Sequence, residues 1–256
     1  MSAAHGEEVA NPFDSDPVAR RYVAGRPYYH RAALERAGIG AVGVALDIGC
    51  GTGLSSRAVR EYAERVVALD ASMAMLAAAE TLPRVSYLAA GAEQIPLGDA
   101  SVDLVTVGAA FHWFDQARVF AELARVMRTG AALVVYSDYF QGRLHERPSF
   151  TDWMRDSYLP QYPGPARHAY FDSEAGQAAG FSAAQYAESE IRVSLTGPQL
   201  ADYLLSQSNA AAAIESGRIG AQALREQIRE QTRKFFPGDE PAEAIYGIRV
   251  WVSAKQ

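Results

Sequence analysis

Apolar and polar positions change along this chain in a regular order that predicts strands separated by helices. Short, nearly continuous apolar runs are typical of strands buried on both faces, and they occur at 44–48, 66–69, 85–88, 101–107 and 131–137. Between the last two runs, apolar residues recur at helical spacing in Val119, Phe120, Leu123, Val126 and Met127. Strands that alternate with helices in this way predict an α/β fold with a mainly parallel sheet.

The pattern changes after the fifth apolar run. Residues 139–171 are rich in aromatic side chains and proline, and they follow a strand end, the edge where open α/β sheets bind ligands. We therefore expect a mainly helical cap at 139–185 that contains the substrate chamber. The remaining organisation is a disordered N-terminus at 1–12, lid helices and a core at 13–138, and a sixth strand, further cap helices and a closing strand at 186–256.

Composition and charge narrow the class of protein. A chain of 256 residues with 49% hydrophobic side chains can bury a sizeable core, and we expect one domain carrying insertions. A net charge of −6 opposes sequence-independent nucleic-acid binding, and with Lys234 and Lys255 as its only lysines the chain has no polybasic membrane anchor. No segment has the apolar core of a signal peptide or an uninterrupted apolar run of about 18 residues, so a cytoplasmic protein is expected. The single cysteine, Cys50, excludes an intrachain disulfide and a cysteine-based metal cluster, and no metal site is predicted.

The strand at 44–48 runs straight into Gly49-Cys50-Gly51-Thr52-Gly53, and the next strand ends in an acid, Asp70. Glycines at alternate positions leave bare peptide groups against which a ligand can lie where a helix begins. Asp70 follows Asp47 by 23 residues, about the spacing at which an acid reaches a ribose hydroxyl in a dinucleotide fold. The nicotinamide fingerprint is G-x-G-x-x-G, however, and here the third glycine comes one residue early. The remaining alternative is a glycine turn that only lets the helix fold back on the strand.

The order Asp-x-Gly-x-Gly-x-Gly at 47–53 resembles motif I of class I S-adenosylmethionine-dependent methyltransferases. The resemblance implies a Rossmann-like, seven-stranded doubly wound sheet, with S-adenosylmethionine as cofactor and S-adenosylhomocysteine as product. It also implies that Asp70 binds both ribose hydroxyls, and that Met73 and the Ala92 amide lie beside adenine. Gly91 stands where many members carry aspartate, so Glu93 and Gln94 are the candidates for the adenine amine. The cofactor-binding residues expected on this basis are Tyr22, Arg26, Asp47, Gly49, Cys50, Gly51, Gly53, Asp70, Ala71, Met73, Ala92, Glu93, Gln94 and Ala109.

A second motif follows the fourth strand. The segment Ala110-Phe111-His112-Trp113-Phe114-Asp115 resembles the small-molecule methyltransferases grouped with trans-aconitate methyltransferase. The likeness continues through 122–130, where Thr129 replaces a proline of the family pattern. Ahead of motif I, Tyr22 and Arg26-Pro27-Tyr28-Tyr29 resemble the N-terminal helices that close over the cofactor in small-molecule methyltransferases, which implies that Tyr22, Arg26 and Tyr28 belong to such a lid. The alternative for each of these three residues is a side chain that covers the sheet edge.

These motifs predict an enzyme that transfers a methyl group to a small molecule, with O-methylation of a carboxylate as the first hypothesis. His112 is the candidate catalytic residue. It donates a hydrogen bond to a carboxylate that has Arg26 as its countercharge, or it is the general base for N- or C-methylation, or its role is structural. A non-catalytic S-adenosylmethionine-binding module would keep the same motifs, and an NAD-dependent oxidoreductase is opposed by the glycine spacing. The candidate substrate-binding residues are Tyr28, Trp113, Trp153 and Tyr158, with core packing as the alternative for the last two.

Overall fold

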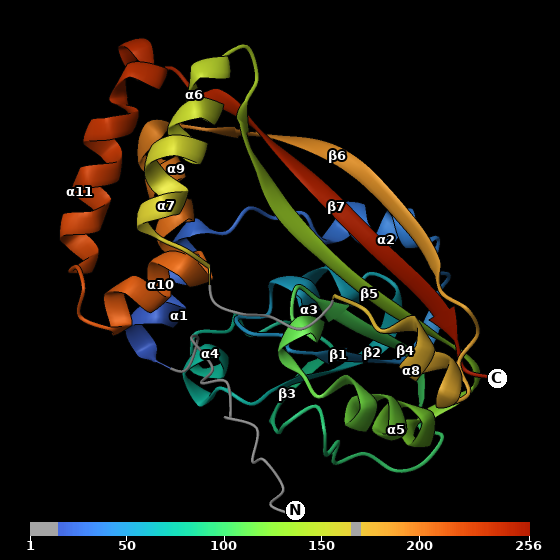
Figure 1. Ribbon diagram of the computed structural model, residues 1–256. Coiled ribbons are helices and arrows are strands. Elements are labelled where there is room, and N and C mark those ends of the chain that lie inside the picture. Colours follow the sequence, from blue (N-terminus) through green and yellow to red (C-terminus); the bar gives the residue numbers. More distant parts are fainter. Residues whose placement is uncertain (1–14, 165–169) are drawn as a thin grey trace, which may run out of the picture.

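A seven-stranded mixed sheet forms the centre of the protein. The computed structural model describes residues 15–164 and 170–256 (Figure 1), so the expected disorder at 1–12 lies outside the described residues. The strands lie in the order β3-β2-β1-β4-β5-β7-β6, in which β1 to β5 are parallel and β7 runs antiparallel between β5 and β6. Their bounds are β1 Val42–Ile48, β2 Ala63–Asp70, β3 Val85–Ala89, β4 Val102–Gly108, β5 Met127–Leu144, β6 Gln185–Leu195 and β7 Ala242–Ala254. The predicted seven-stranded, doubly wound α/β fold is confirmed.

Helices cover both faces of the parallel strands, because alternate side chains of each strand point to opposite faces. Ala45 of β1 packs in the same core as Leu34 and Val59, which belong to α2 and α3. Leu46 of β1 packs on the other face, together with Phe120 of α5. The flanking helices are α1 Asp16–Gly25, α2 His30–Ala37, α3 Leu54–Val59, α4 Met73–Ala77, α5 Gln116–Val126 and α8 Ser173–Ala178.

Two helix starts depend on side chains that satisfy the first free backbone N–H groups. The Ser72 hydroxyl accepts a 3.2 Å hydrogen bond from the Met75 amide at the start of α4. The Asp115 carboxylate accepts a 3.2 Å bond from the Arg118 amide at the start of α5. These caps fix where α4 begins after β2 and where α5 begins after β4.

The fifth strand is longer than its apolar run predicts. It was expected at 131–137, but it continues to Leu144 because it pairs with β7 from Ala132 opposite Ala254 to Leu144 opposite Ala244. Tyr139 and Phe140, which the aromatic composition assigned to the cap, therefore belong to the sheet. The inserted segment begins after Leu144 rather than at 139. Figure 1 shows β5, β6 and β7 running well past the parallel strands to reach the cap helices.

The cap is built from two segments that are far apart in sequence. The first contains α6 Pro148–Trp153, a π-helical turn η2 Met154–Tyr158 and α7 Leu159–Gln161. The second follows β6 and contains α9 Gly197–Leu205, α10 Ser208–Glu215 and α11 Ala221–Thr232, with short 3-10 turns η3 Arg233–Phe235 and η4 Pro237–Asp239. They share one hydrophobic core, which includes Phe150, Trp153, Tyr158, Leu200, Tyr203 and Phe235. No helix among the described residues is both long and apolar enough to cross a membrane.

Candidate active site

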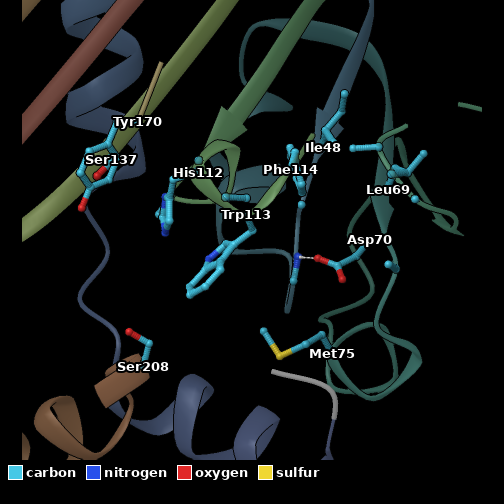
Figure 2. A pocket seen from close by; sticks show the side chains of 18 of the residues that line it. Ile48, Leu69, Asp70, Met75, His112, Trp113, Phe114, Ser137, Tyr170 and Ser208 are labelled. Atoms are coloured by element: carbon cyan, nitrogen blue, oxygen red, sulfur yellow. Dashed lines mark hydrogen bonds between the residues drawn. The ribbon is translucent and has the colours of Figure 1, made fainter. Parts of the chain in front are cut away.

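A cavity of about 780 Å³ lies at the carboxyl ends of the parallel strands. Its volume falls within the range of roughly 300–1,000 Å³ that small-molecule sites occupy. The chain leaves β1 and β4 in opposite directions here, which makes this edge the switch point where open α/β sheets bind ligands. Figure 2 shows Asp70 and Met75 on one side of the cavity and Ser137 and Tyr170 on the other, with His112 and Trp113 between them.

The glycine loop forms one wall because its backbone takes conformations that side chains disfavour. Gly49, Gly51 and Gly53 have φ of +66°, +53° and +83°. A Cβ atom on Gly49 would lie 2.4 Å from the Ala110 Cβ, and one on Gly53 would lie 2.3 Å from the Tyr87 hydroxyl oxygen. Gly49 and Gly51 line the cavity directly, whereas Gly53 and the buried Cys50 are outside its lining.

Asp47 supports this loop from behind and does not line the cavity, in contrast to its expected place beside the cofactor. Its fully buried carboxylate accepts 2.6 Å hydrogen bonds from the Ser55 and Ser56 hydroxyls and a 2.8 Å bond from the Thr106 hydroxyl. The carboxylate therefore ties the start of α3 and the middle of β4 to β1. Desolvation by burial raises the pKa of Asp47 to about 6, although the three hydroxyl donors oppose that shift.

Asp70 joins the end of β2 to the glycine loop. Its carboxylate accepts hydrogen bonds of 2.8 Å from the Gly51 amide (Figure 2) and of 2.8 Å from the Ser72 amide. Asp70 and the neighbouring Ala71 both line the cavity. Asp70 therefore fixes the loop and presents carboxylate oxygens on the cavity wall.

The methionine of α4 that lines the cavity is Met75, not Met73. Met73 is the first residue of the helix and is 66% exposed, so its expected contact with adenine is corrected. Met75 lies half a turn further along, is buried, and would approach a Cβ atom on Gly51 to 3.0 Å. The difference follows from where the Ser72 cap starts the helix.

The loop after β3 contributes Ala92 and Glu93 to the cavity wall. Glu93 accepts a 3.1 Å hydrogen bond from the Asp115 amide, which joins this loop to the start of α5. Gln94 is exposed and lies outside the lining. Ala109, just after β4, also lines the cavity and has a φ of +55°, an uncommon value for alanine that holds the chain in a sharp turn.

His112 and Trp113 lie on a 3-10 turn, η1 Phe111–Trp113, between β4 and α5. Both line the cavity and point into it in Figure 2. His112 is only 5% exposed, and its ring centroid lies 4.8 Å from that of Trp113 and 5.0 Å from that of Tyr170. The turn therefore holds an imidazole among aromatic rings at the centre of the cavity.

The N-terminal segment brings two of its three expected residues to the cavity. Tyr22 and Arg26 both line it, and the Arg26 guanidinium lies 4.7 Å from the centre of the Tyr22 ring while donating a 3.0 Å bond to the Ser206 carbonyl. Tyr28 follows Pro27, where α1 has already ended, and is 41% exposed outside the cavity lining. Its ring lies instead beneath the guanidinium of Arg57 at 5.2 Å, so its expected substrate contact is corrected.

Trp153 and Tyr158 pack in the core of the cap and are not among the residues that line the cavity. Their polar atoms have partners there, since the Trp153 indole N–H donates to the Gln231 side chain at 3.1 Å and the Tyr158 hydroxyl donates to the Leu204 carbonyl at 3.3 Å. Their predicted place in the substrate chamber is therefore corrected in favour of core packing.

Comparison with known proteins agrees with this geometry. Residues 46–135, which contain the glycine loop, Asp70 and His112, match the family model described as a methyltransferase domain. We refer to the matched segment, residues 46–135, as the methyltransferase domain. It is 42% identical over 113 residues to an uncharacterized methyltransferase of Mycobacterium tuberculosis, a match that covers 44% of this chain and 46% of the relative. It is also 40% identical over 103 residues to a malonyl-[acyl-carrier protein] O-methyltransferase of Serratia marcescens, which covers 40% of each chain. The chain thus aligns with less than half the length of these curated relatives.

Solved structures resemble the protein over more of its length than the methyltransferase domain alone. One from Anaeromyxobacter dehalogenans, described as a candidate type II methyltransferase, is 28% identical, with a TM-score of 0.66 over 89% of this chain and 97% of that one. Phosphoethanolamine N-methyltransferase 2 of Haemonchus contortus, at 19% identity, gives a TM-score of 0.57 over 95% of this chain and 59% of that one. At 19% identity, the similarity to the Haemonchus structure shows a shared fold.

Several residues that line the cavity lie outside the methyltransferase domain and carry no local motif. They are Ser137 and Asp138 on β5, Tyr170 before α8, and Gln207 and Ser208 between α9 and α10. The polar run Ser206-Gln207-Ser208 between two apolar helices was the available signal for the last pair, but a short turn between helices has the same composition.

Proposed function

We propose that this chain is an S-adenosylmethionine-dependent methyltransferase that acts on a small molecule held in the cavity beneath the cap. One observation carries the proposal. Within the methyltransferase domain, the Asp70 carboxylate is bonded to the Gly51 amide on the wall of a cavity of about 780 Å³ at the switch point of the sheet.

The residues present fit that cofactor. Gly49 and Gly51 offer bare backbone to its amino-acid end, Asp70 offers carboxylate oxygens to ribose hydroxyls, and Ala92 and Glu93 lie where the adenine would bind. When bound, S-adenosylmethionine supplies a methyl group on a positively charged sulfonium. The leaving group is thus already activated, and the contribution of the chain is to align the acceptor and to exclude water. The aromatic rings of Trp113 and Tyr170 around His112 suit that task.

We further propose that the methylated atom is a carboxylate oxygen of the acceptor. The resemblance of 110–115 to the trans-aconitate methyltransferase group supports this, as does the Serratia relative, whose name describes an O-methyltransferase of a malonyl group. His112 would donate a hydrogen bond to that carboxylate. Methylation of nitrogen or carbon, with His112 as the general base, is the alternative, and a non-catalytic cofactor-binding module is the second.

Ligand-dependent stability and turnover test the proposed function together. S-adenosylhomocysteine should raise the melting temperature whereas NAD should not, because a ligand of the native state stabilises it by mass action. A screen of acids, phenols and amines should then form S-adenosylhomocysteine in step with a methylated product. A thermal shift with NAD alone would reverse the cofactor assignment. Cofactor binding with no turnover of any acceptor would favour the non-catalytic alternative.

The variant His112→Gln separates the two roles of the imidazole. Glutamine can donate a hydrogen bond but cannot act as a base at neutral pH, so on the carboxylate proposal the variant keeps appreciable turnover and mainly raises the KM for the acceptor. A loss of kcat of about 100-fold or more, with cofactor affinity intact, would instead identify base catalysis.

A further inference from the structure

Three side chains that line the cavity each carry a buried polar atom that has no hydrogen-bond partner within the described part of the chain. These atoms are Nε of Arg26, Oδ2 of Asp138 and Nε2 of Gln207. Leaving a buried donor or acceptor unpaired costs about 1–3 kcal/mol, so such groups are usually satisfied by a ligand or by water. Two donors and one acceptor around one space suit a ligand that both accepts and donates hydrogen bonds.

Asp138 and Gln207 lie on the side of the cavity away from Asp70 and the glycine loop. Asp70 stands at the end of β2, whereas Asp138 belongs to β5, and β1 and β4 separate the two strands in the sheet. In Figure 2, Ser137, the neighbour of Asp138, lies across His112 and Trp113 from Asp70. Asp138 and Gln207 also lie outside the methyltransferase domain at 46–135. Their position therefore suits recognition of the acceptor rather than of the cofactor.

The charges in this region define what kind of group it can hold. Burial raises the pKa of the Asp138 carboxyl, whereas the positive charge of Arg26 and the Tyr29 hydroxyl lower it, so the region pairs one cation with one acidic group. A second carboxylate placed beside Asp138 would be repelled, and Arg26 is already bonded to the Ser206 carbonyl. An amine or hydroxyl can instead donate to Asp138 while its electron pair or a neighbouring oxygen accepts from Arg26 or Gln207.

We propose that Arg26, Asp138 and Gln207 form an acceptor subsite that recognises an amine or hydroxyl group on the methyl acceptor, at a distance from the atom that is methylated. This inference rests on the proposed function and narrows its substrate class to acceptors that carry such a hydrogen-bond donor. Asp138 is the residue that selects for the donor.

Binding of simple aromatic acids tests the subsite. The probes are 3- and 4-hydroxybenzoate and 3- and 4-aminobenzoate, compared with benzoate, because they combine a carboxylate with a ring that suits the aromatic walls. Their affinities are measured by calorimetry with and without S-adenosylhomocysteine. We expect at least one donor-bearing probe to bind about tenfold more tightly than benzoate, the effect of one well-placed hydrogen bond. Asp138→Asn should remove that preference and leave the affinity for S-adenosylhomocysteine unchanged.

A second variant and a matched control keep the test decisive if Asp138→Asn fails to fold. Gln207 is the N-cap residue of α10, but its side chain makes no capping bond, so Gln207→Ala removes a donor without uncapping the helix. It should weaken the donor-bearing probes and spare benzoate. Asp152→Asn makes the same chemical change on the cap surface, where Asp152 pairs with Arg155, and should change neither affinity.

Three results would overturn the subsite: equal affinities for all probes, no binding of any probe, or a preference that persists in both variants. A fourth would reassign it. If Asp138→Asn weakens S-adenosylhomocysteine but not 5′-methylthioadenosine, which lacks the amino-acid end, Asp138 recognises the cofactor instead. Failure of the proposed function shows separately, as no binding of S-adenosylhomocysteine or no turnover, whereas the subsite is judged on probe affinity alone.

Discussion

The buried carboxylate of Asp47 should make the stability of this protein depend on pH, and Asp47→Asn should remove that dependence. Burial raises the pKa of Asp47 from the ordinary value of 3.8 to about 6 in the folded protein. At pH values between 3.8 and about 6, the Asp47 carboxyl is therefore protonated in the folded protein and ionised in the unfolded chain. The stability that this proton contributes is complete below the unfolded pKa and is lost as the pH rises through about 6.

The size of the effect follows from linkage between proton binding and folding. For the pKa of 3.8 rising to about 6, Asp47 should contribute about 1.4 kcal/mol more to the unfolding free energy at pH 5.0 than at pH 7.5. Other titrating groups affect both proteins equally. When the pH is lowered from 7.5 to 5.0, the unfolding free energy of wild type should therefore rise by that amount relative to the unfolding free energy of Asp47→Asn.

Urea unfolding followed by circular dichroism at the two pH values measures this difference. A difference that stays constant to within about 0.4 kcal/mol, the usual additivity error, would refute the assigned shift.

Thr106→Val supplies an independent check because it removes the 2.8 Å bond to the ionised carboxylate. It should cost about 1.5–3 kcal/mol at pH 7.5, as for hydrogen bonds to charged groups, and should raise the pKa of Asp47 further.

Further substitutions test the loop and the cap. Asp70→Ala should weaken S-adenosylhomocysteine binding by about 2–4 kcal/mol, because it removes a partly buried, charge-assisted acceptor. An unchanged calorimetric affinity in a folded variant would contradict the ribose assignment. Gly53→Ala should lower the melting temperature, because the new Cβ atom would lie 2.3 Å from the Tyr87 hydroxyl oxygen. Adding Tyr87→Ala should restore part of the lost melting temperature. An unaltered melting temperature in Gly53→Ala would show that the loop adapts. Trp153→Ala should lower the free energy of unfolding, measured with urea, by about 3–5 kcal/mol, because it truncates a core side chain. The affinity for S-adenosylhomocysteine should not change. A weakened affinity with little loss of stability would show that Trp153 belongs to the binding site.

The side of the cavity that we propose for the cofactor could be located from the sequence because its determinants are local in sequence. The glycine spacing, the acid at the end of β2 and the capping residues Ser72 and Asp115 each act within a few positions of the structure they specify. The errors on this side are errors of register. The exchange of Met73 for Met75 depends on the exact first residue of α4, which a periodic pattern does not fix.

The length of β5 could not be predicted because it depends on a distant partner. Residues 138–144 contain Asp, Gln, Gly and Arg, a composition that favours a loop, yet residues 138–140 and Leu144 pair with β7, which lies 100 to 110 positions later in the chain. Pairing satisfies the backbone groups of this segment regardless of its composition. The same extension carries Asp138 past the end of β4 and into the cavity.

The side of the cavity that we propose for the acceptor is assembled from segments that meet only in the folded protein. Arg26 donates to the Ser206 carbonyl across 180 positions of sequence, and this bond joins α1 to the turn that carries Gln207. The aromatic residues of the cap hold the same turn from behind, since the Tyr158 hydroxyl donates to the Leu204 carbonyl and the Asn209 side chain donates to the Tyr162 carbonyl at 2.9 Å. The cap aromatics thus act on the site through the position of this turn. Substitutions at 204–209 should therefore change acceptor selection more readily than cofactor affinity, because the glycine loop and Asp70 belong to a separately bonded part of the cavity wall.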